Sequence, residues 1–189
     1  MKNIEERILR DGQVIDNDIL KVDSFLNHQV DIAFLQEFAQ GVRKALPDVR
    51  VDKVLTIETS GIAVAYALCE AFGCPSLVFA KKSKSKTVGD DVFKTQIHSF
   101  TRGFSCEVTV SNKYLREGEN VLIADDFLAL GNASLGLLDL CAQAGAHPVA
   151  VAVVIEKLFQ GGRERIEAKG VPVFSGAGVK AFVDGKPAF

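Results

Sequence analysis

Two adjacent carboxylates, Asp125 and Asp126, are the residues of this sequence best suited to chemistry. Four apolar residues, 121–124, precede them and predict a buried strand that the two acids end. A loop of small residues follows, and the apolar periodicity of 135–144 predicts a helix. A helix N-terminus presents free backbone N–H groups and can hold a phosphate. An acidic pair beside such an anion site suits a ribose diol or a hydrated divalent cation. The alternative is a solvated pair that only caps the helix, because short motifs also match by chance.

Two other predicted strands also end in polar residues. Residues 54–57 predict a strand, followed by a tight turn over 58–61 that opens a helix. Residues 149–155 are almost all apolar, as in a central parallel strand, and end in the charged pair 156–157. In a parallel sheet these ends share one edge, where ligands bind. Two helix N-termini at that edge predict a ligand with two separated anionic groups.

A basic segment interrupts this pattern. Residues 81–90 contain four lysines and predict a solvated loop, either a flap over an anionic ligand or a charged hairpin tip. Residues 92–100 and 106–110 alternate in polarity and predict an antiparallel pair, with 101–103 as its turn. Residues 13–30 show no clean pattern, so they predict a hood over a ligand or a surface arm.

The elements that carry these residues predict an α/β fold. Helical periodicity appears over 3–10, and again from the capping residue Asp31 to about Leu46. Strands that alternate with helices predict βαβ units, a parallel sheet and right-handed crossovers. A chain of 189 residues is long enough for one domain with a full core.

Composition excludes several classes of function. The formal net charge of −2 argues against nucleic-acid or membrane binding through bulk charge. The four cysteines form no CxxC pair and the three histidines are scattered, which argues against a structural zinc site. With no apolar leader or long apolar span, the sequence predicts a cytoplasmic, reducing location.

The stretch from Val121 to Ser134 resembles the phosphoribosyl-diphosphate (PRPP) motif of the type I phosphoribosyltransferases. The turn 58–61 resembles their diphosphate loop, and residues 81–100 resemble their flexible hood. Within the family, the resemblance is closest to the bacterial xanthine phosphoribosyltransferases. It is carried by four segments and covers nearly the whole chain: 20–29, 57–63, 125–129 and 154–160.

This resemblance implies a Rossmann-like parallel sheet with a flexible hairpin and a small N-terminal base-binding hood. Residues 1–189 would form a single domain, with 1–30 as the N-terminal hood segment and 81–104 as the flexible loop. The implied reaction is purine salvage, in which the 5-phosphoribosyl group moves from PRPP to xanthine and gives xanthosine 5′-monophosphate and diphosphate. Mg²⁺ would arrive with PRPP or diphosphate, with no metal held by the protein alone. The implied assembly is a homodimer.

Site residues follow from the same resemblance. It implies that PRPP is bound by Asp125, Asp126, Ala129, Leu130, Gly131, Asn132 and Ala133. The diphosphate loop would consist of Glu58, Thr59, Ser60 and Gly61. Xanthine would contact Leu20, Asn27 and Lys157. No residue is assigned a catalytic role, because the protein would act by positioning and electrostatics.

Two residues depart from the wider family pattern. Ala129 stands where hypoxanthine/guanine relatives carry an Asp that exchanges a proton with the purine N7, whereas xanthine-type enzymes share the small residue. Leu130 stands where many relatives have a hydroxyl or amide side chain, so backbone amides, Asn132 or Ser134 would have to do more for the phosphate. Two alternatives therefore remain: a PRPP-binding regulator without catalysis, and a phosphoribosyltransferase for hypoxanthine or guanine.

Overall fold

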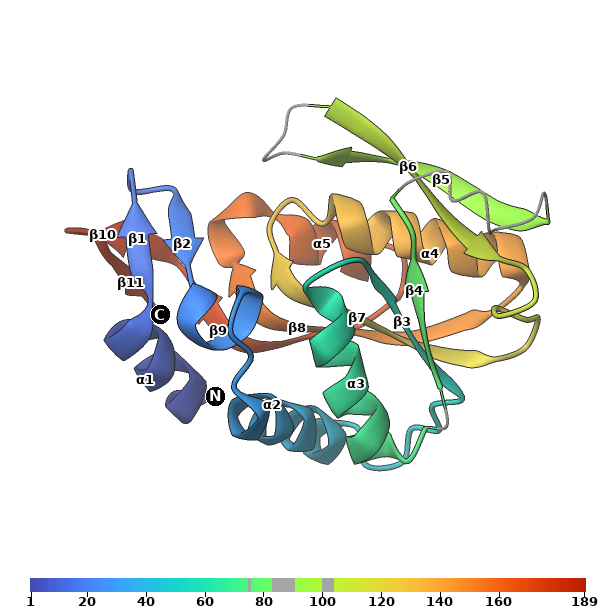
Figure 1. The fold of residues 1–189 in the computed structure, drawn as a ribbon, viewed down its shortest axis with the longest axis horizontal. Coiled ribbons are helices and arrows are strands. Elements are labelled where there is room, and N and C mark those ends of the chain that lie inside the picture. Colours follow the sequence, from blue (N-terminus) through green and yellow to red (C-terminus); the bar gives the residue numbers. More distant parts are fainter. Residues whose placement is uncertain (75, 83–90, 100–103) are drawn as a thin grey trace.

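The computed structural model describes residues 1–74, 76–82, 91–99 and 104–189, and its centre is a five-stranded sheet (Figure 1). The strands lie in the order β4-β3-β7-β8-β9. Their bounds are β3 (Lys53–Ile57), β4 (Leu77–Ala80), β7 (Asn120–Leu128), β8 (His147–Lys157) and β9 (Val173–Val179). All neighbouring strands pair in parallel. The predicted α/β class with a parallel sheet is confirmed.

Helices cover both faces of this sheet. Figure 1 shows α2 (Ile32–Ala45) and α3 (Gly61–Phe72) on one face, and α4 (Asn132–Ala144) and α5 (Gly162–Glu167) on the other. Each face has its own apolar core. Within β8, Ala152 belongs to one core and Val153 to the other, so successive residues point to opposite faces. A strand buried on both faces explains the continuous apolar sequence of β8.

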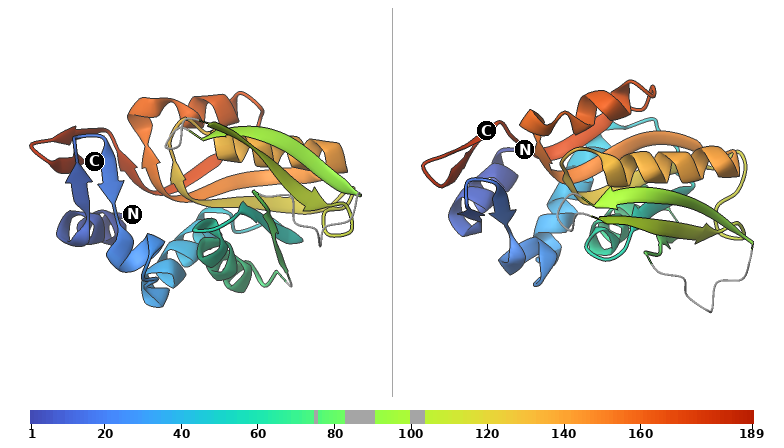
Figure 2. Two further views of the ribbon diagram at one scale, coloured as in Figure 1. Left: turned by 45° about the horizontal axis from the view of Figure 1, so that its top comes forward. Right: turned by 90° about the horizontal axis from the view of Figure 1, so that it is seen from above.

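The two ends of the chain meet at one end of the sheet (Figures 1 and 2). The N-terminal elements are α1 (Lys2–Asp11), β1 (Gln13–Ile15), β2 (Ile19–Lys21) and a π-helical turn, η1 (Asp23–Asn27). The C-terminal elements are β10 (Ala181–Val183) and β11 (Lys186–Ala188). β1 pairs with β2, and β10 with β11, in antiparallel hairpins. Three-residue strands are too short to show a periodicity, which is why the sequence predicted neither hairpin.

A separate antiparallel pair, β5 (Val92–Ser99) and β6 (Phe104–Ser111), lies beside α4. This confirms the pair predicted from alternating polarity, while the predicted turn 101–103 and most of the lysine loop fall outside the described residues. Gly136 of α4 permits the close approach, because a Cβ there would lie 2.6 Å from the side chain of Ile97. Lys81 also bridges to Thr109, which joins the end of β4 to β6.

The start of α2 and the end of β7 were both predicted from the sequence, and only the first prediction is correct. The Asp31 side chain accepts a hydrogen bond from the Phe34 N–H at 3.1 Å and caps α2, as predicted. The prediction that the acidic pair ends its strand is wrong. β7 continues to Leu128, because its ladder with β8 runs past Asp125 to the pair Leu128–Glu156. In the described part of the chain, no helix is long and apolar enough to cross a membrane.

Candidate active site at the carboxyl edge of the sheet

Three neighbouring strands, β3, β7 and β8, bring the predicted site residues to one edge of the sheet. The three strands are parallel, and Leu55 and Val151 both pair with Ile123, so their carboxyl ends lie together. β3 leads into α3 and β7 leads into α4, so two helix N-termini open at this edge. The predicted meeting of these strand ends at one edge is confirmed, and the binding of two anionic groups there stays a prediction.

The acidic pair is formed by one buried and one half-buried carboxyl group. Asp125 is only 6% exposed, and its Oδ1 accepts a hydrogen bond from the Asp126 N–H at 3.0 Å. Burial, and then the neighbouring Asp126 carboxylate, raise the pKa of Asp125 well above its ordinary value, while Lys82 acts in the opposite direction. Asp125 therefore keeps its proton to a higher pH than a solvated carboxyl does.

The N-terminal segment reaches this acidic pair. Asn27, at the end of η1, donates from Nδ2 to Oδ2 of Asp126. The contact joins a residue predicted to bind the base to one predicted to bind the ribose. Leu20, also predicted to contact the base, does not point its side chain to solvent. That side chain is buried in the apolar core that includes residues of α2 and α3.

The predicted diphosphate loop lies against the carboxyl group of Asp125. The peptide bond between Glu58 and Thr59 is cis, and Glu58 Oε1 accepts a hydrogen bond from the Lys82 N–H at 2.6 Å. A Cβ on Gly61 would lie 2.1 Å from Thr56 Oγ1 and 3.3 Å from Asp125 Oδ1. A glycine is therefore needed where α3 begins, and it places the start of α3 beside the acidic pair.

The second loop, residues 129–133, is shaped by glycines on both sides. Gly131 has a φ of 79°, a left-handed conformation that a glycine adopts without strain. A Cβ on Gly162 would lie 2.3 Å from the carbonyl oxygen of Ala129, so this loop rests directly on the start of α5. The loop backbone then enters α4 at Asn132. Gly131, at the N-cap of α4, has no side chain that could cap the helix, and backbone N–H groups at a helix N-terminus can hold an anion.

Arg165 is a residue of this site that sequence reasoning missed. From α5, its Nη1 donates to the carbonyl oxygen of Leu130 and to Asn132 Oδ1, the latter at 2.9 Å. It thereby cross-links two residues of the predicted phosphate loop. No motif marks it in the sequence, because a short helix more than thirty positions downstream approaches the loop only in the folded chain.

Lys157, the predicted base-reading lysine, is held by a residue that sequence reasoning also missed. Its Nζ donates to the carbonyl oxygen of Asp18 at 2.6 Å and lies 4.0 Å from Asp18 Oδ1, and the lysine side chain is 13% exposed. Burial lowers the pKa of Lys157, and the Asp18 charge partly opposes this. The sequence did offer a signal for the turn that carries Asp18. Asp16 and Asn17 take positive φ between β1 and β2, as these residue types do in tight hairpins.

Glu156, next to Lys157, is paired elsewhere. It is 1% exposed, and its carboxylate accepts two hydrogen bonds from the Arg163 guanidinium, at 2.9 and 2.5 Å. Lys157 is therefore not neutralised by its neighbour in sequence. Among the described residues, no three His, Cys, Asp or Glu side chains are grouped so that they could hold a metal ion.

The sequence also matches a known domain family. The model of the phosphoribosyl transferase domain matches residues 22–184. The chain belongs to the phosphoribosyltransferase family. Full-length relatives include the xanthine phosphoribosyltransferase of Clostridioides difficile, which is 49% identical over 189 residues and covers 100% of both chains. That of Laribacter hongkongensis is 46% identical over 189 residues, again with 100% of both chains covered.

Solved phosphoribosyltransferase structures share the fold. The adenine phosphoribosyltransferase of Rhodothermus marinus superposes with a TM-score of 0.76 at 17% identity, covering 95% of this chain and 100% of that one. The enzyme of Giardia lamblia complexed with 9-deazaadenine gives a TM-score of 0.75 at 23% identity, covering 88% and 93%. At such low identity the likeness extends to the fold alone.

Proposed function

We propose that this chain transfers the 5-phosphoribosyl group of PRPP to xanthine and releases xanthosine 5′-monophosphate and diphosphate. The observation that carries this proposal is 49% identity over the full length to a protein named xanthine phosphoribosyltransferase. The edge of the sheet supports it independently, because two helix N-termini flank an acidic pair. PRPP has this distribution of charge, with a phosphate and a diphosphate on either side of a ribose diol.

In this proposal each loop binds one part of PRPP. Backbone N–H groups of residues 129–133 hold the 5′-phosphate, and those of 59–61 hold the diphosphate. Asp125 and Asp126 accept hydrogen bonds from the ribose hydroxyls. Mg²⁺, when bound with PRPP, neutralises charge on the leaving diphosphate. It prefers few carboxylates plus substrate oxygens and water, so it would be held mainly by PRPP beside the acidic pair.

The base is held at the other end of the site. Lys157 donates a hydrogen bond to an exocyclic oxygen of xanthine, and Asn27 positions the ring from the N-terminal hood. Xanthine is acidic enough to be partly ionised near neutral pH, so its proton has already gone to solvent. A nitrogen of this anion then attacks C1 of the ribose as the bond from C1 to the diphosphate oxygen breaks, and diphosphate leaves with that electron pair. Ala129 cannot carry a proton, so the protein contributes orientation and charge stabilisation. Adenine lacks the exocyclic oxygen and would leave the Lys157 ammonium unpaired.

Nucleotide formation from separate bases tests the function. The protein is incubated with PRPP, Mg²⁺ and one of xanthine, hypoxanthine, guanine or adenine, and product is followed by chromatography. The proposal expects the highest kcat/KM with xanthine. If no base yields product although PRPP binds, the chain is a PRPP-binding regulator. A preference for hypoxanthine or guanine would assign it to the sibling activity.

A substitution at Lys157 tests base recognition. Lys157→Met keeps the length of the side chain but removes the ammonium donor. We expect kcat/KM for xanthine to fall about 10- to 100-fold, the size of a lost hydrogen bond to a charged group. An unchanged ratio of xanthine to hypoxanthine would show that Lys157 does not read the base.

Three further features belong to the same proposal. We propose a homodimer, by analogy with the family, with residues 1–30 as the base-binding hood of a single domain. The expected flexible loop, 81–104, lies in large part outside the described residues. A cytoplasmic location agrees with four free cysteines, of which Cys69, Cys74 and Cys141 are buried. Sedimentation of the purified protein tests the dimer directly.

A further inference from the structure

Two hairpins from opposite ends of the chain lie side by side (Figures 1 and 2). The C-terminal hairpin, β10–β11, packs against the N-terminal hairpin, β1–β2, because β11 contacts both β1 and α1. Lys157, at the end of β8, lies between them. Its Nζ donates to the Asp18 carbonyl oxygen in the turn of the first hairpin, and lies 5.7 Å from the centre of the Phe182 ring on the second. The lysine predicted to read the base thus has an aromatic neighbour that the proposed function does not use.

The C-terminal hairpin fixes the direction of the Phe182 side chain. Its turn, 184–185, takes positive φ at both residues, 49° and 72°, as in tight two-residue hairpins. Phe182 pairs with the buried Pro187, while its two neighbours in β10 are exposed. Since successive residues of a strand point to opposite faces, Phe182 points inward. The Phe159 ring meets it edge to face, with centroids 5.8 Å apart, so a second ring also fixes its position.

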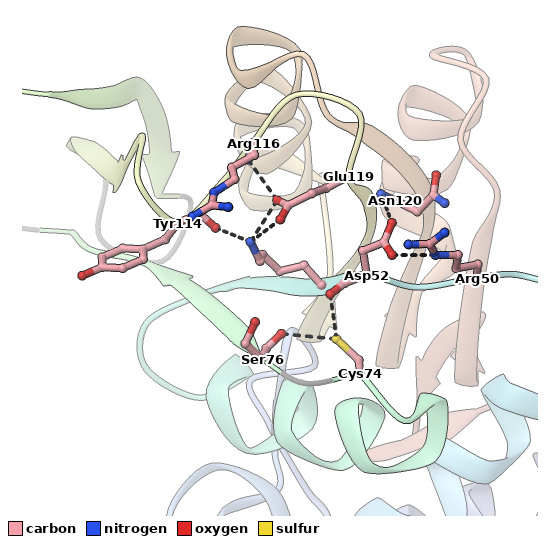
Figure 3. A network of polar contacts seen from close by, with 9 residues as sticks. Arg50, Asp52, Cys74, Ser76, Tyr114, Arg116, Glu119 and Asn120 are labelled. Carbon is pink, nitrogen blue, oxygen red and sulfur yellow. Dashed lines mark hydrogen bonds and ion pairs between the residues drawn. The ribbon is translucent and has the colours of Figure 1, made fainter.

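Another shielded lysine shows what Lys157 lacks. The Lys53 side chain is 10% exposed, and its Nζ donates to Glu119 Oε1 at 2.7 Å, to Oε2 at 2.9 Å and to the Tyr114 carbonyl oxygen at 2.6 Å (Figure 3). The Lys157 side chain is 13% exposed, yet within the described ranges its Nζ has one hydrogen-bond acceptor, the Asp18 carbonyl oxygen at 2.6 Å. The Asp18 carboxylate lies 4.0 Å away. Two of the three protons on Lys157 are therefore left for a ligand.

A shielded ammonium with so few acceptors needs another source of stabilisation. Burial lowers the pKa of Lys157, and the Asp18 charge only partly opposes this. Glu156, the neighbouring carboxylate in sequence, is paired with Arg163 instead. The face of an aromatic ring is negative and attracts a cation within about 6 Å, most strongly where water is excluded. Such a ring stabilises the ammonium without occupying its hydrogen-bond donors.

We propose that Phe182 is a positioning residue for base recognition, because its ring holds the Lys157 ammonium charged and in place while its N–H donors stay free for the purine. This role rests on the proposed function, since it needs Lys157 to donate to an exocyclic oxygen of the base. A carboxylate in the place of the ring would take those donors, as Glu119 takes those of Lys53. The alternative is a ring that only packs beneath the hairpin.

Titration of Lys157 in the unliganded protein tests the contact itself. NMR follows the side-chain signals of isotope-labelled lysine with pH, and Lys157→Met identifies the Lys157 signal by its loss. Phe182→Leu keeps the apolar bulk but removes the ring, so we expect Lys157 to lose its proton at a lower pH than in the wild type. Phe182→Tyr keeps the ring face and should restore the wild-type titration. Val183→Ala, at a 55% exposed position of the same strand, is the control and should not change it.

Kinetics with PRPP and xanthine test whether this contact serves base recognition. We expect Phe182→Leu to lower kcat/KM for xanthine about 2- to 5-fold, mainly through the KM for xanthine, and Phe182→Tyr to recover it. In Lys157→Met the ring has no cation to hold, so adding Phe182→Leu should cause no further loss. A loss of the same size in both backgrounds would show that the ring acts on the substrate or the fold directly, and would overturn the proposal.

The outcomes separate this role from the proposed function. An unchanged Lys157 titration in Phe182→Leu, with the fold intact by circular dichroism, would overturn the role of Phe182 even if xanthine is the best substrate. If no base yields product, the proposed function fails and the role in base recognition fails with it. The titration of the unliganded protein would still show whether the ring holds the ammonium.

Discussion

Asp125 is a carboxyl group in an unfavourable position. It is buried, it neighbours a second carboxyl group, and both features raise its pKa. Groups perturbed in this way concentrate at functional sites, where a bound ligand can supply partners for a buried charge. In the proposed function those partners are ribose hydroxyls and the metal that accompanies PRPP. The unliganded protein would then be less stable than its fold allows.

Asp125→Asn should therefore stabilise the unliganded protein. A raised pKa means that the folded chain binds this proton more tightly than the unfolded chain, so stability is lost as pH rises through the window above the ordinary aspartate pKa. The amide cannot ionise and escapes this loss. We expect a higher Tm by calorimetry, with a gap to the wild type that widens from acidic to neutral pH. A gain of 1 kcal/mol corresponds to about 2–4 °C at this chain length.

The matched control is Asp48→Asn, at an exposed position on the loop after α2, where no such gap is expected. The same Asp125→Asn protein should bind PRPP more weakly, so stability and function would move in opposite directions. A Tm below that of the wild type at neutral pH, with the fold intact by circular dichroism, would contradict this account of Asp125.

The Asp18 charge opposes the effect of burial on the pKa of Lys157. Burial lowers the pKa of the lysine and the Asp18 charge raises it, so Asp18→Asn should lower it further while the carbonyl contact remains. The lysine then loses its proton at a lower pH. We expect the alkaline fall of kcat/KM for xanthine to begin at a lower pH than in the wild type. Ionisation of xanthine itself is common to both proteins and cancels in the comparison.

Asp16→Asn is the control for this shift. Asp16 lies in the same turn with a φ of 52°, which asparagine also tolerates, and the Lys157 ammonium donates to Asp18 and not to Asp16. An alkaline limb that moves equally in both variants would reflect the turn, not the charge on Asp18. The sequence singles out Lys157 but not its partner, because Asp18 precedes Lys157 by 139 positions and lies in a segment without periodicity.

At the scale of elements, the loop between β7 and α4 shows how a short helix can support a binding site. Leu130 offers no side-chain donor, and Arg165 from α5 instead fixes the loop through the Leu130 carbonyl oxygen and Asn132. The glycine contact between this loop and Gly162 brings α5 close enough for this. Arg165 would therefore be a positioning residue for the 5′-phosphate.

Arg165→Met should raise KM for PRPP with little change in kcat. The arginine is exposed, so we expect the binding free energy of PRPP to weaken by about 0.5–1.5 kcal/mol, which is about 2- to 12-fold in KM. Arg165→Lys should recover part of the loss, because one ammonium can reach only some of the acceptors that the guanidinium fork reaches. Lys169→Met, an exposed cation just beyond α5, is the control. Equal KM values in all four proteins would exclude this role.

Element order was largely predictable, and the reasons are physical. The central strands and long helices bury continuous or periodic apolar faces, which the sequence displays directly. The end of β7 was not predictable, since ladder bonds to β8 carry the strand through two charged residues. The three-residue strands of β1, β2, β10 and β11 were missed because pairing with a neighbour, and not local pattern, makes them strands.

At the scale of the whole molecule, the sheet edge that carries the predicted site depends on contacts between α5, β8 and β9. Arg163 of α5 donates to Glu156 of β8, and also to the Val173 carbonyl oxygen and Ser175 Oγ of β9. One guanidinium thus joins a helix to two strands next to Lys157. This contact was not predictable either, because its partners meet only when β9 is placed beside β8.

Arg163→Met should destabilise the protein by about 3–5 kcal/mol, because it leaves Glu156, which is 1% exposed, as an unpaired buried charge. Urea denaturation measures this loss. Glu156→Gln should cost less, since Arg163 keeps its other acceptors and its side chain is 27% exposed. The decisive protein is Arg163→Met/Glu156→Gln. If the buried charge causes the loss, this double variant is more stable than Arg163→Met alone. If it is no more stable, the packing of α5 on the sheet, and not the ion pair, holds this side of the molecule together.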